Sequence, residues 1–248
     1  MNVPQPRILV SPVAYNERVR IKSVIERFCK SRAFGKTDYL IVDDGSNDGT
    51  SEVIASYAPQ GVKTLKHAKR SGVGAAIRSA IRYAQINNYD VLVIMAGNDK
   101  DNPDEVPYVI GPIVEQGLDL VHGSRYLGKV GSGGAMPLYR KLATRLHPFI
   151  FSCFTGRALT DTTNGFRAMR VKVFDDTRIN LDQEWLDTYE LEPYILYKVI
   201  TLGYKFKEVF VTKIYPPKSA GGYTKMVPLI SWWSILKPLF YLRLGIRK

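Results

Sequence analysis

Long apolar runs without polar alternation divide the first half of this 248-residue chain. Residues 39–43 (YLIVD) and 91–95 (VLVIM) are the clearest of these runs, and helix-like stretches separate them from their neighbours. A strand that is apolar on both faces has to be covered on both faces, as in a parallel sheet between two helical layers. The pattern therefore predicts an α/β fold. The expected order is strand 7–13, helix 17–31, strand 39–43, helix 50–57, strand 62–65, helix 72–87, strand 91–95, helix 103–116, strand 118–122, helix 137–154, helix 191–202 and edge strand 205–212.

Polar clusters follow four of these strands at their carboxyl ends. They occupy residues 11–17, 43–50, 97–103 and 123–126. In open α/β sheets, ligands bind beyond the carboxyl ends of the strands. The sequence therefore predicts a binding site at this edge of the sheet.

The cluster after strand 39–43 reads VDDGSNDGT over residues 42–50. Its adjacent carboxylates, Asp43 and Asp44, can accept hydrogen bonds from a base or a ribose, and its glycines permit a tight turn. The alternative is a turn that ends in a helix cap, with Asp48 or Thr50 as the capping residue.

This loop and the PVAYNE run at residues 12–17 resemble family 2 glycosyltransferases. More narrowly, they are similar to the dolichol-phosphate mannose synthase group and its polyprenyl-phosphate relatives, over roughly residues 7–225. The resemblance implies a Rossmann-like GT-A fold, with a mixed, mainly parallel sheet, helices on both faces and membrane-interface helices. We expect a GT-A domain over residues 1–224, which includes an interface helix at 137–154, and a C-terminal amphipathic membrane-interface segment at 225–248.

The resemblance also implies a nucleotide-sugar site. A Gly-x-Gly pair in residues 70–76 (RSGVGAA) opens a helix whose N-terminus can approach a diphosphate. Glu190 and Glu192 resemble acidic positions near the sugar. Residues 218–225 resemble the family's Arg-x-x-Gly-x-Ser-Lys loop, although Ser219 stands at the arginine position. The expected binding residues are Pro12, Ala14, Tyr15, Glu17, Asp43, Asp44, Arg70, Gly72, Glu192, Lys218 and Lys225.

The loop after strand 91–95 departs from the family's Asp-x-Asp-x-Gln form. When the two are aligned on the following proline, Gly97 stands at the first Asp, Asp99 at the second and Asp101 at the Gln. Two carboxylates at i and i+2 suit Mg²⁺ or Mn²⁺, which would neutralise charge on a leaving diphosphate. Asp99 and Asp101 are the predicted metal ligands, and Asp99 is also a predicted catalytic residue. A cap on the next helix is the alternative.

The helix expected at 137–154 carries Arg140, Thr144 and His147 at spacings of four and three, which places them on one face. It resembles the interface helix that holds a lipid phosphate in lipid-phosphate mannosyltransferases. Arg125, from a Gly-Ser-Arg segment, and Arg140 are the predicted catalytic residues for that phosphate, with Thr144 assisting. An ordinary amphipathic surface helix is the alternative. Residues 161–167 (DTTNGFR) are expected to form a structural wall of the site.

The chain carries a net charge of +12, which indicates an anionic partner. Acidic loops at the strand ends oppose nucleic acid, so a phosphorylated lipid and a membrane surface are the expected partners. Residues 228–244 (PLISWWSILKPLFYLRL) suit a membrane interface, or a helix buried against the domain. No run of about 18 uncharged apolar residues predicts a spanning helix. We expect a peripheral, monotopic protein at the cytoplasmic face of a membrane.

Together these features predict a metal-dependent, inverting transfer of a sugar to a dolichyl or polyprenyl phosphate. Mannose from GDP-mannose is the favoured donor, and UDP-glucose is the second. The alternatives are glucose transfer to the same lipid, transfer to a glycan hydroxyl, and a catalytically dead nucleotide-sugar-binding module. The glycine at position 97 motivates the last of these.

Overall fold

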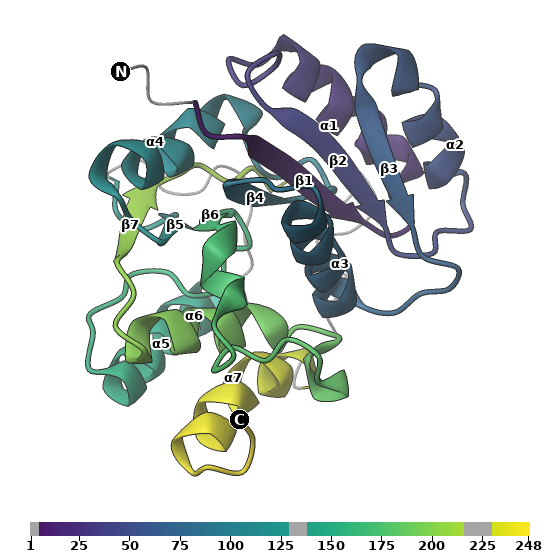
Figure 1. Cartoon of the computed structure of the whole chain (residues 1–248). Coiled ribbons are helices and arrows are strands. Elements are labelled where there is room, and N and C mark those ends of the chain that lie inside the picture. Colours follow the sequence, from purple (N-terminus) through teal and green to yellow (C-terminus); the bar gives the residue numbers. More distant parts are fainter. Residues whose placement is uncertain (1–4, 129–137, 216–229) are drawn as a thin grey trace.

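The computed structural model describes residues 5–128, 138–215 and 230–248, except for the side chains of residues 138–141 and 230. In these residues one mixed sheet separates two layers of helices (Figure 1). Its strands are β1 (Ile8–Ala14), β2 (Asp38–Asp43), β3 (Val62–Lys66), β4 (Val91–Ala96), β5 (Leu120–Ser124), β6 (Arg167–Arg170) and β7 (Phe206–Phe210).

The helices lie close to their predicted bounds. They are α1 (Arg18–Lys30), α2 (Thr50–Ala55), α3 (Val73–Ile86), α4 (Val106–Gln116), α5 (Leu138–Thr155), α6 (Leu191–Thr201) and α7 (Ile230–Arg243). Short 3₁₀ helices also occur: η1 (Ala58–Gln60), η2 (Pro103–Glu105), η3 (Val171–Asp175) and η4 (Glu184–Leu186).

The strands are ordered β3-β2-β1-β4-β6-β5-β7 across the sheet. β1 pairs in parallel with β2 and β4, and β3 and β7 extend the sheet in parallel at its two ends. β6 runs antiparallel between β4 and β5. The predicted mixed, mainly parallel sheet is confirmed, and β7 is the edge strand that the sequence predicted. The sequence did not predict β6.

The alternation of side chains along the central strands divides the core in two. Val10, Ile41 and Val93 face a core that α1, α2 and α4 cover. Leu9 and Leu92, one residue away, face a second core that includes buried residues of α3, α5, α6 and α7. Figure 1 shows α5, α6 and α7 grouped on this second side. The carboxyl ends of β1, β2 and β4 therefore point toward a space that helices from the second half of the chain enclose.

The C-terminal helix α7 packs against this group through both polar and apolar residues. Lys237 forms an ion pair of 2.6 Å with buried Glu190, and Leu239 is fully buried. The rings of Phe154 and Phe240 lie 5.0 Å apart between centroids. This part of the tail is buried against the domain, whereas Trp233, whose ring stacks on that of Phe240 at 6.0 Å, is 51% exposed. Within the described ranges, no helix has the length and apolar character needed to cross a membrane.

Candidate functional site

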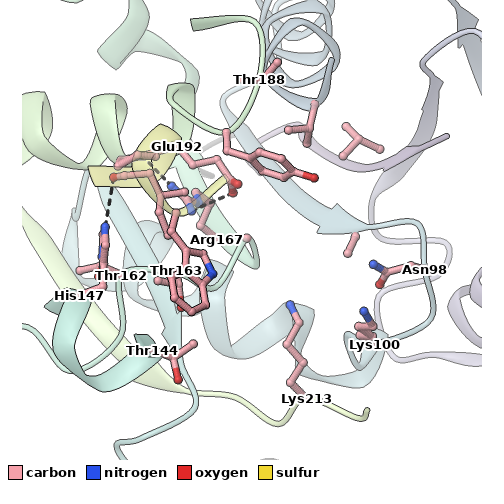
Figure 2. A pocket seen from close by; sticks show the side chains of 18 of the residues that line it. Asn98, Lys100, Thr144, His147, Thr162, Thr163, Arg167, Thr188, Glu192 and Lys213 are labelled. Atoms are coloured by element: carbon pink, nitrogen blue, oxygen red, sulfur yellow. Dashed lines mark hydrogen bonds and ion pairs between the residues drawn. The ribbon is translucent and has the colours of Figure 1, made fainter. Parts of the chain in front are cut away.

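A cavity of about 640 Å³ lies at the predicted edge of the sheet. The carboxyl ends of β1 and β4 and the N-terminus of α3 form one part of its wall. Segments 162–167 and 188–193 and the inner faces of α5 and α7 form the rest. In Figure 2, Asn98 and Lys100 lie at one side of the view, and Thr144, His147 and Thr162 lie at the other.

The two carboxylates after β2 have different roles. Asp44 lines the cavity and accepts hydrogen bonds of 2.8 Å from the backbone N–H groups of Ser71 and Gly72. His67 Nδ1 lies 2.8 Å from the same carboxylate. Asp44 thereby holds the start of α3 at the cavity, and its contact with a nucleotide stays a prediction.

Asp43 is fully buried and does not line the cavity. Its carboxylate accepts the backbone N–H of Ser46 at 3.0 Å and the hydroxyl of Ser51. Asp48 accepts the N–H of Thr50 at 3.0 Å, at the first residue of α2. For Asp43 the structure supports the turn alternative, and it does not bring this residue to the cavity. The N-cap residue of α2 is Gly49, so neither Asp48 nor Thr50 is the capping residue that the sequence suggested.

The loop after β1 supplies Ala14, Tyr15 and Glu17 to the cavity wall. The guanidinium of Arg70 lies 4.5 Å from the centre of the Tyr15 ring, a distance that allows cation–π attraction. Pro12 lies inside β1 and outside the cavity lining. Of the six residues predicted from segments 12–17 and 70–76, all except Pro12 therefore meet at the cavity.

Gly72 lines the cavity, but its small size serves the protein's own packing. A Cβ atom at Gly72 would lie 2.3 Å from the carbonyl oxygen of Asp187, and one at Gly74 would lie 2.0 Å from that of Leu186. The N–H of Ala75 donates to Asp187 O at 3.0 Å. The close neighbour of this helix start is therefore backbone of the chain, where the sequence predicted a diphosphate.

The structure does not bring the two predicted metal ligands to the cavity. Asp99 pairs with Arg27 of α1 at 2.6 Å and accepts the hydroxyl of Ser23 at 2.7 Å. Asp101 accepts the N–H of Ala96 at 2.8 Å and pairs with Lys213 at 2.8 Å. Neither carboxylate lines the cavity, and each is held by partners within the protein.

Gly97, at the place of the family's first Asp, has a steric reason to be glycine. A Cβ atom there would lie 2.7 Å from Val13 O and 2.9 Å from the Cβ of Ala14. A carboxylate binds a hard divalent cation only when its oxygens are free to replace water molecules on that cation. Both remaining carboxylates already bind cations of the protein, so the loop as folded does not fit the predicted metal. Among the described residues, no group of three or more His, Cys, Asp or Glu side chains could hold a metal ion.

Three residues that the sequence did not single out line the cavity at this loop: Asn98, Lys100 and Lys213. Lys213 also contacts Asn164 Oδ1 at 2.8 Å. Among the described residues, Asn98 Oδ1 is buried and has no hydrogen-bond partner. The sequence held a signal for two of them. Asn98 and Lys100 alternate with Asp99 and Asp101 along the chain, so the two pairs can face opposite sides of the loop.

Arg125 reaches the cavity but is held by a buried network. Its Nε and Nη2 donate to Asp161 at 2.6 and 2.7 Å, and its Nη1 donates to the Tyr215 hydroxyl at 2.6 Å. Burial opposes the charge of Arg125, but the Asp161 carboxylate outweighs burial and raises the pKa of the guanidinium. Arg125 therefore stays charged, and two nitrogens of its guanidinium donate to Asp161.

The inner face of α5 contributes Thr144 and His147 to the cavity. Thr144 Oγ1 lies 2.6 Å from the Tyr126 hydroxyl, and His147 Nδ1 lies 2.6 Å from Thr162 Oγ1. Burial lowers the pKa of His147. The helix thus presents the polar face that the sequence predicted. The Arg140 side chain lies outside the described residues, as do Lys218 and Lys225.

Of the two acidic residues predicted to lie near the sugar, Glu190 and Glu192, only one lines the cavity. Glu192 lines the cavity and pairs with Arg167 at 2.9 Å (Figure 2). Glu190 is buried, pairs with Lys237 of α7 and does not line the cavity. Arg167 itself is buried and also donates to Asn164 O at 2.9 Å, which fits the structural role expected for segment 161–167.

An apolar wall faces these polar groups. It is formed by Leu142, Leu146 and Ile150 of α5 together with Ile235 and Leu236 of α7. Leu142 and Leu146 are 69% and 52% exposed, so this wall continues to the outer surface of the protein. The cavity therefore joins a charged region to an apolar surface.

Comparison with known proteins gives a consistent result. The sequence model described as Glycosyl transferase family 2 matches residues 12–178. The chain is 30% identical over 228 residues to an undecaprenyl-phosphate mannosyltransferase of Micrococcus luteus, with 87% of this chain and 88% of the relative covered. It is 29% identical over 215 residues to a polyprenol monophosphomannose synthase of Mycolicibacterium smegmatis, with 84% and 78% covered.

The fold is similar to that of glucosyl-3-phosphoglycerate synthase from Mycobacterium tuberculosis, solved with Mn²⁺, UDP and phosphoglyceric acid. The TM-score is 0.67 at 18% identity, with 98% of this chain and 80% of that chain covered. The same synthase is also solved with Mg²⁺ and UDP. These structures confirm the predicted GT-A type of fold, which in those proteins accommodates a divalent cation.

Proposed function

This chain belongs to glycosyl transferase family 2, and we propose that it transfers a sugar from a nucleotide sugar to a polyprenyl or dolichyl phosphate at a membrane surface. The observation that carries this proposal is the cavity with two unlike walls. Charged and polar groups gather at the sheet edge, where a nucleotide diphosphate can bind. The leucines of α5 extend from the opposite wall to the surface, where an isoprenoid chain can enter.

Mannose is the favoured sugar, since both relatives described above are named for it. GDP-mannose is the first donor to test, and UDP-glucose is the second. Ala14, Tyr15, Glu17, Asp44 and Arg70 are proposed to hold the nucleotide, because they share the part of the cavity at the ends of β1 and β2. Lys218 and Lys225 stay predictions for the diphosphate, on the basis of the sequence alone.

The acceptor is an anion before it arrives, so its phosphate oxygen needs no strong general base. We propose that it attacks the anomeric carbon in line and inverts the configuration there. Thr144 of α5 is proposed to contact this phosphate, with Arg140 one helical turn earlier. Arg125, which Asp161 holds, is proposed to fix the wall beside it with a permanent positive charge.

A divalent cation at the diphosphate, Mg²⁺ or Mn²⁺, is the prediction from the sequence, and the solved structures with these ions support such a use of the fold. In this chain Asp99 and Asp101 bind cations of the protein itself.

Peripheral membrane binding is proposed through the exposed apolar residues of α5, which begin at the mouth of the cavity, and the C-terminal segment 225–248. Leu142, Leu146 and Phe149 are exposed along one side of α5, and Trp233 is exposed on α7. Such residues enter the headgroup region readily, and nearby lysines and arginines are attracted to anionic lipids. A location at the cytoplasmic face follows from the family resemblance and is part of this proposal.

The function is tested with the purified chain, undecaprenyl phosphate in detergent, and either GDP-mannose or UDP-glucose. We expect a hexosyl lipid phosphate, detected by mass spectrometry, with one donor strongly preferred. Transfer only to glycan hydroxyls would replace the lipid phosphate as acceptor. Binding of the nucleotide sugar without any transfer would identify a binding module.

Membrane binding is tested by flotation with vesicles that contain anionic lipid. Phe149→Glu should reduce the bound fraction, because it places a charge on the proposed insertion face. Val19→Glu is the matched control, since Val19 is 88% exposed on α1, a helix of the opposite layer. Equal binding by both variants would remove α5 from the membrane interface.

A further inference from the structure

We propose that Lys100 and Lys213, together with Asn98, bind the donor's diphosphate and supply the positive charge that a divalent cation would supply in the metal-binding form of this loop. The inference rests on the proposed function, because it assumes a nucleotide diphosphate in the cavity. It concerns the three residues at the ends of β4 and β7 that line the cavity without having a part in the predicted site.

In the loop after β4, residues that line the cavity alternate with residues that do not. Asn98 and Lys100 line the cavity, whereas Asp99 and Asp101 do not. Three contacts fix which of these residues face the cavity. Asp99 pairs with Arg27 at 2.6 Å, and Asp101 accepts the N–H of Ala96 at 2.8 Å. The N–H of Ile214 donates to Lys100 O at 2.9 Å. The loop is therefore anchored so that it offers an amide and an ammonium group to a ligand.

The two lysines lie on neighbouring segments of the chain. Asp101 and Lys213 form an isolated antiparallel β-bridge, so the segment after β7 runs directly beside the loop. The Nζ of Lys100 lies 6.0 Å from the centre of the Tyr215 ring, and Tyr215 follows Lys213 by two residues. Both ammonium groups thus belong to one small region of the wall, and Figure 2 shows both side chains at the cavity.

The lysines at this loop are largely buried. Lys100 is 6% exposed and the Lys213 side chain 11%, so neither ammonium group is fully solvated. Asp101 pairs with Lys213, and Asp99 pairs with Arg27. The ammonium groups that line the cavity repel a divalent cation and attract an anion. A diphosphate brings several anionic oxygens that can accept charge-assisted hydrogen bonds from them.

Asn98 adds an observation that is independent of charge. Its Oδ1 is buried and has no partner among the described residues, although buried polar atoms nearly always have one. The amide also carries two N–H donors, and rotation about its terminal bond exchanges the two ends. A phosphate oxygen or a sugar hydroxyl in the cavity would satisfy it.

In the proposed step, a bond forms between an acceptor phosphate oxygen and the anomeric carbon. The bond from that carbon to the β-phosphate oxygen breaks, and its electron pair leaves with the nucleoside diphosphate. The acceptor phosphate loses one negative charge and the leaving diphosphate gains one, so no proton has to move. The lysines are placed to donate to the oxygens on which that charge develops.

The test is calorimetric titration of GDP, UDP, GMP and UMP into the protein, first in EDTA and then with Mn²⁺. We expect the preferred diphosphate to bind in EDTA and its Kd to change less than threefold with Mn²⁺. Lys100→Met should weaken diphosphate binding at least tenfold and monophosphate binding less than threefold. Lys213→Met should do the same, and Lys213→Arg should restore most of the affinity. Lys172→Met, which removes an exposed lysine on η3, is the charge-matched control.

Lys100→Met decides the question even if Lys213→Met, which leaves Asp101 without its cation, does not fold. Diphosphate binding that requires Mn²⁺ and ignores Lys100→Met would overturn the inference and leave the proposed function standing. Failure of the unaltered protein to bind any of the four nucleotides, with or without Mn²⁺, would instead overturn the proposed function and this inference with it.

Discussion

Two acidic loops flank β1 at the same edge of the sheet, and they differ in what holds their carboxylates. After β2, backbone N–H and hydroxyl groups hold Asp43 and Asp44. After β4, Arg27 holds Asp99 and Lys213 holds Asp101. The first loop turns one carboxylate to the cavity, whereas in the second loop both carboxylates pair with cations of the protein and neither lines the cavity. An acidic motif at a strand end therefore indicates a site, but its partners decide the sign of the charge presented there.

The largest expected effect tests the first loop. Asp44→Ala removes the acceptor of two backbone N–H groups at the start of α3. A hydrogen bond to a charged group contributes about 1.5–3 kcal/mol, so the free energy of unfolding should fall by roughly 3–5 kcal/mol in a urea titration. Asp182→Ala is the control, since Asp182 is 66% exposed and its ion pair with Arg82 contributes about 0–1 kcal/mol. Equal losses in the two variants would mean that Asp44 does not organise the site.

The next effect restores an acidic residue in the second loop. Gly97→Asp places a Cβ atom 2.7 Å from Val13 O, so β1 or β4 has to move. Overpacking of this kind costs about 1–3 kcal/mol, and we expect a lower Tm with no added stabilisation by Mn²⁺. Gly97→Ala should lose most of the same stability, since the clash arises at Cβ. A Gly97→Asp variant that keeps its Tm and is stabilised by Mn²⁺ would show that the loop can become a metal site.

Asp101→Asn distinguishes the two interpretations of the second loop by the sign of the effect. The amide oxygen can still accept the N–H of Ala96, but the negative charge beside Lys213 is lost. An interaction of about 1 kcal/mol between charges corresponds to roughly a fivefold change in Kd. If the lysines bind the diphosphate, its affinity in EDTA should rise by about that factor. If Asp101 is a metal ligand, affinity in Mn²⁺ should fall, and titration of GDP and UDP under both conditions decides.

The sequence predicted the central sheet well because the strands that build it are apolar on both faces. β6 was missed, since its residues RAMR look polar. Arg167 and Arg170 are accommodated there by carbonyl oxygens from distant segments: Arg167 donates to Asn164 O, and Arg170 donates to Leu118 O and Ile113 O. Such partners cannot be read from four residues.

The same reason explains which parts of the site were predicted. Tyr15 and Asp44 follow the carboxyl ends of β1 and β2, and Thr144 lies on one face of α5, so a local pattern placed each of them at the cavity. Which side of the loop 97–101 faces the cavity depends on Arg27 of α1 and on Lys213 after β7, which are far apart in the sequence. The i and i+2 spacing of the aspartates was visible, but the side of the chain that faces the cavity was not.

The smallest expected effect belongs to Asp99, which the sequence predicted to be a catalytic metal ligand. Asp99 has a backbone φ of 59°, a conformation that asparagine also tolerates, so Asp99→Asn removes the charge without adding backbone strain. The side chains of Arg27 and Asp99 are 31% and 27% exposed, and a pair with that exposure contributes about 0–1 kcal/mol. Transfer should stay within about threefold of the unaltered protein, because the carboxylate lies outside the cavity. Arg27→Gln should have an effect of the same size, and the double variant should add little, since both changes remove one interaction. A loss of transfer by orders of magnitude in Asp99→Asn alone, with Arg27→Gln unaffected, would place a metal ion on Asp99. It would also mean that the two loops bind their ligands with the same chemistry after all.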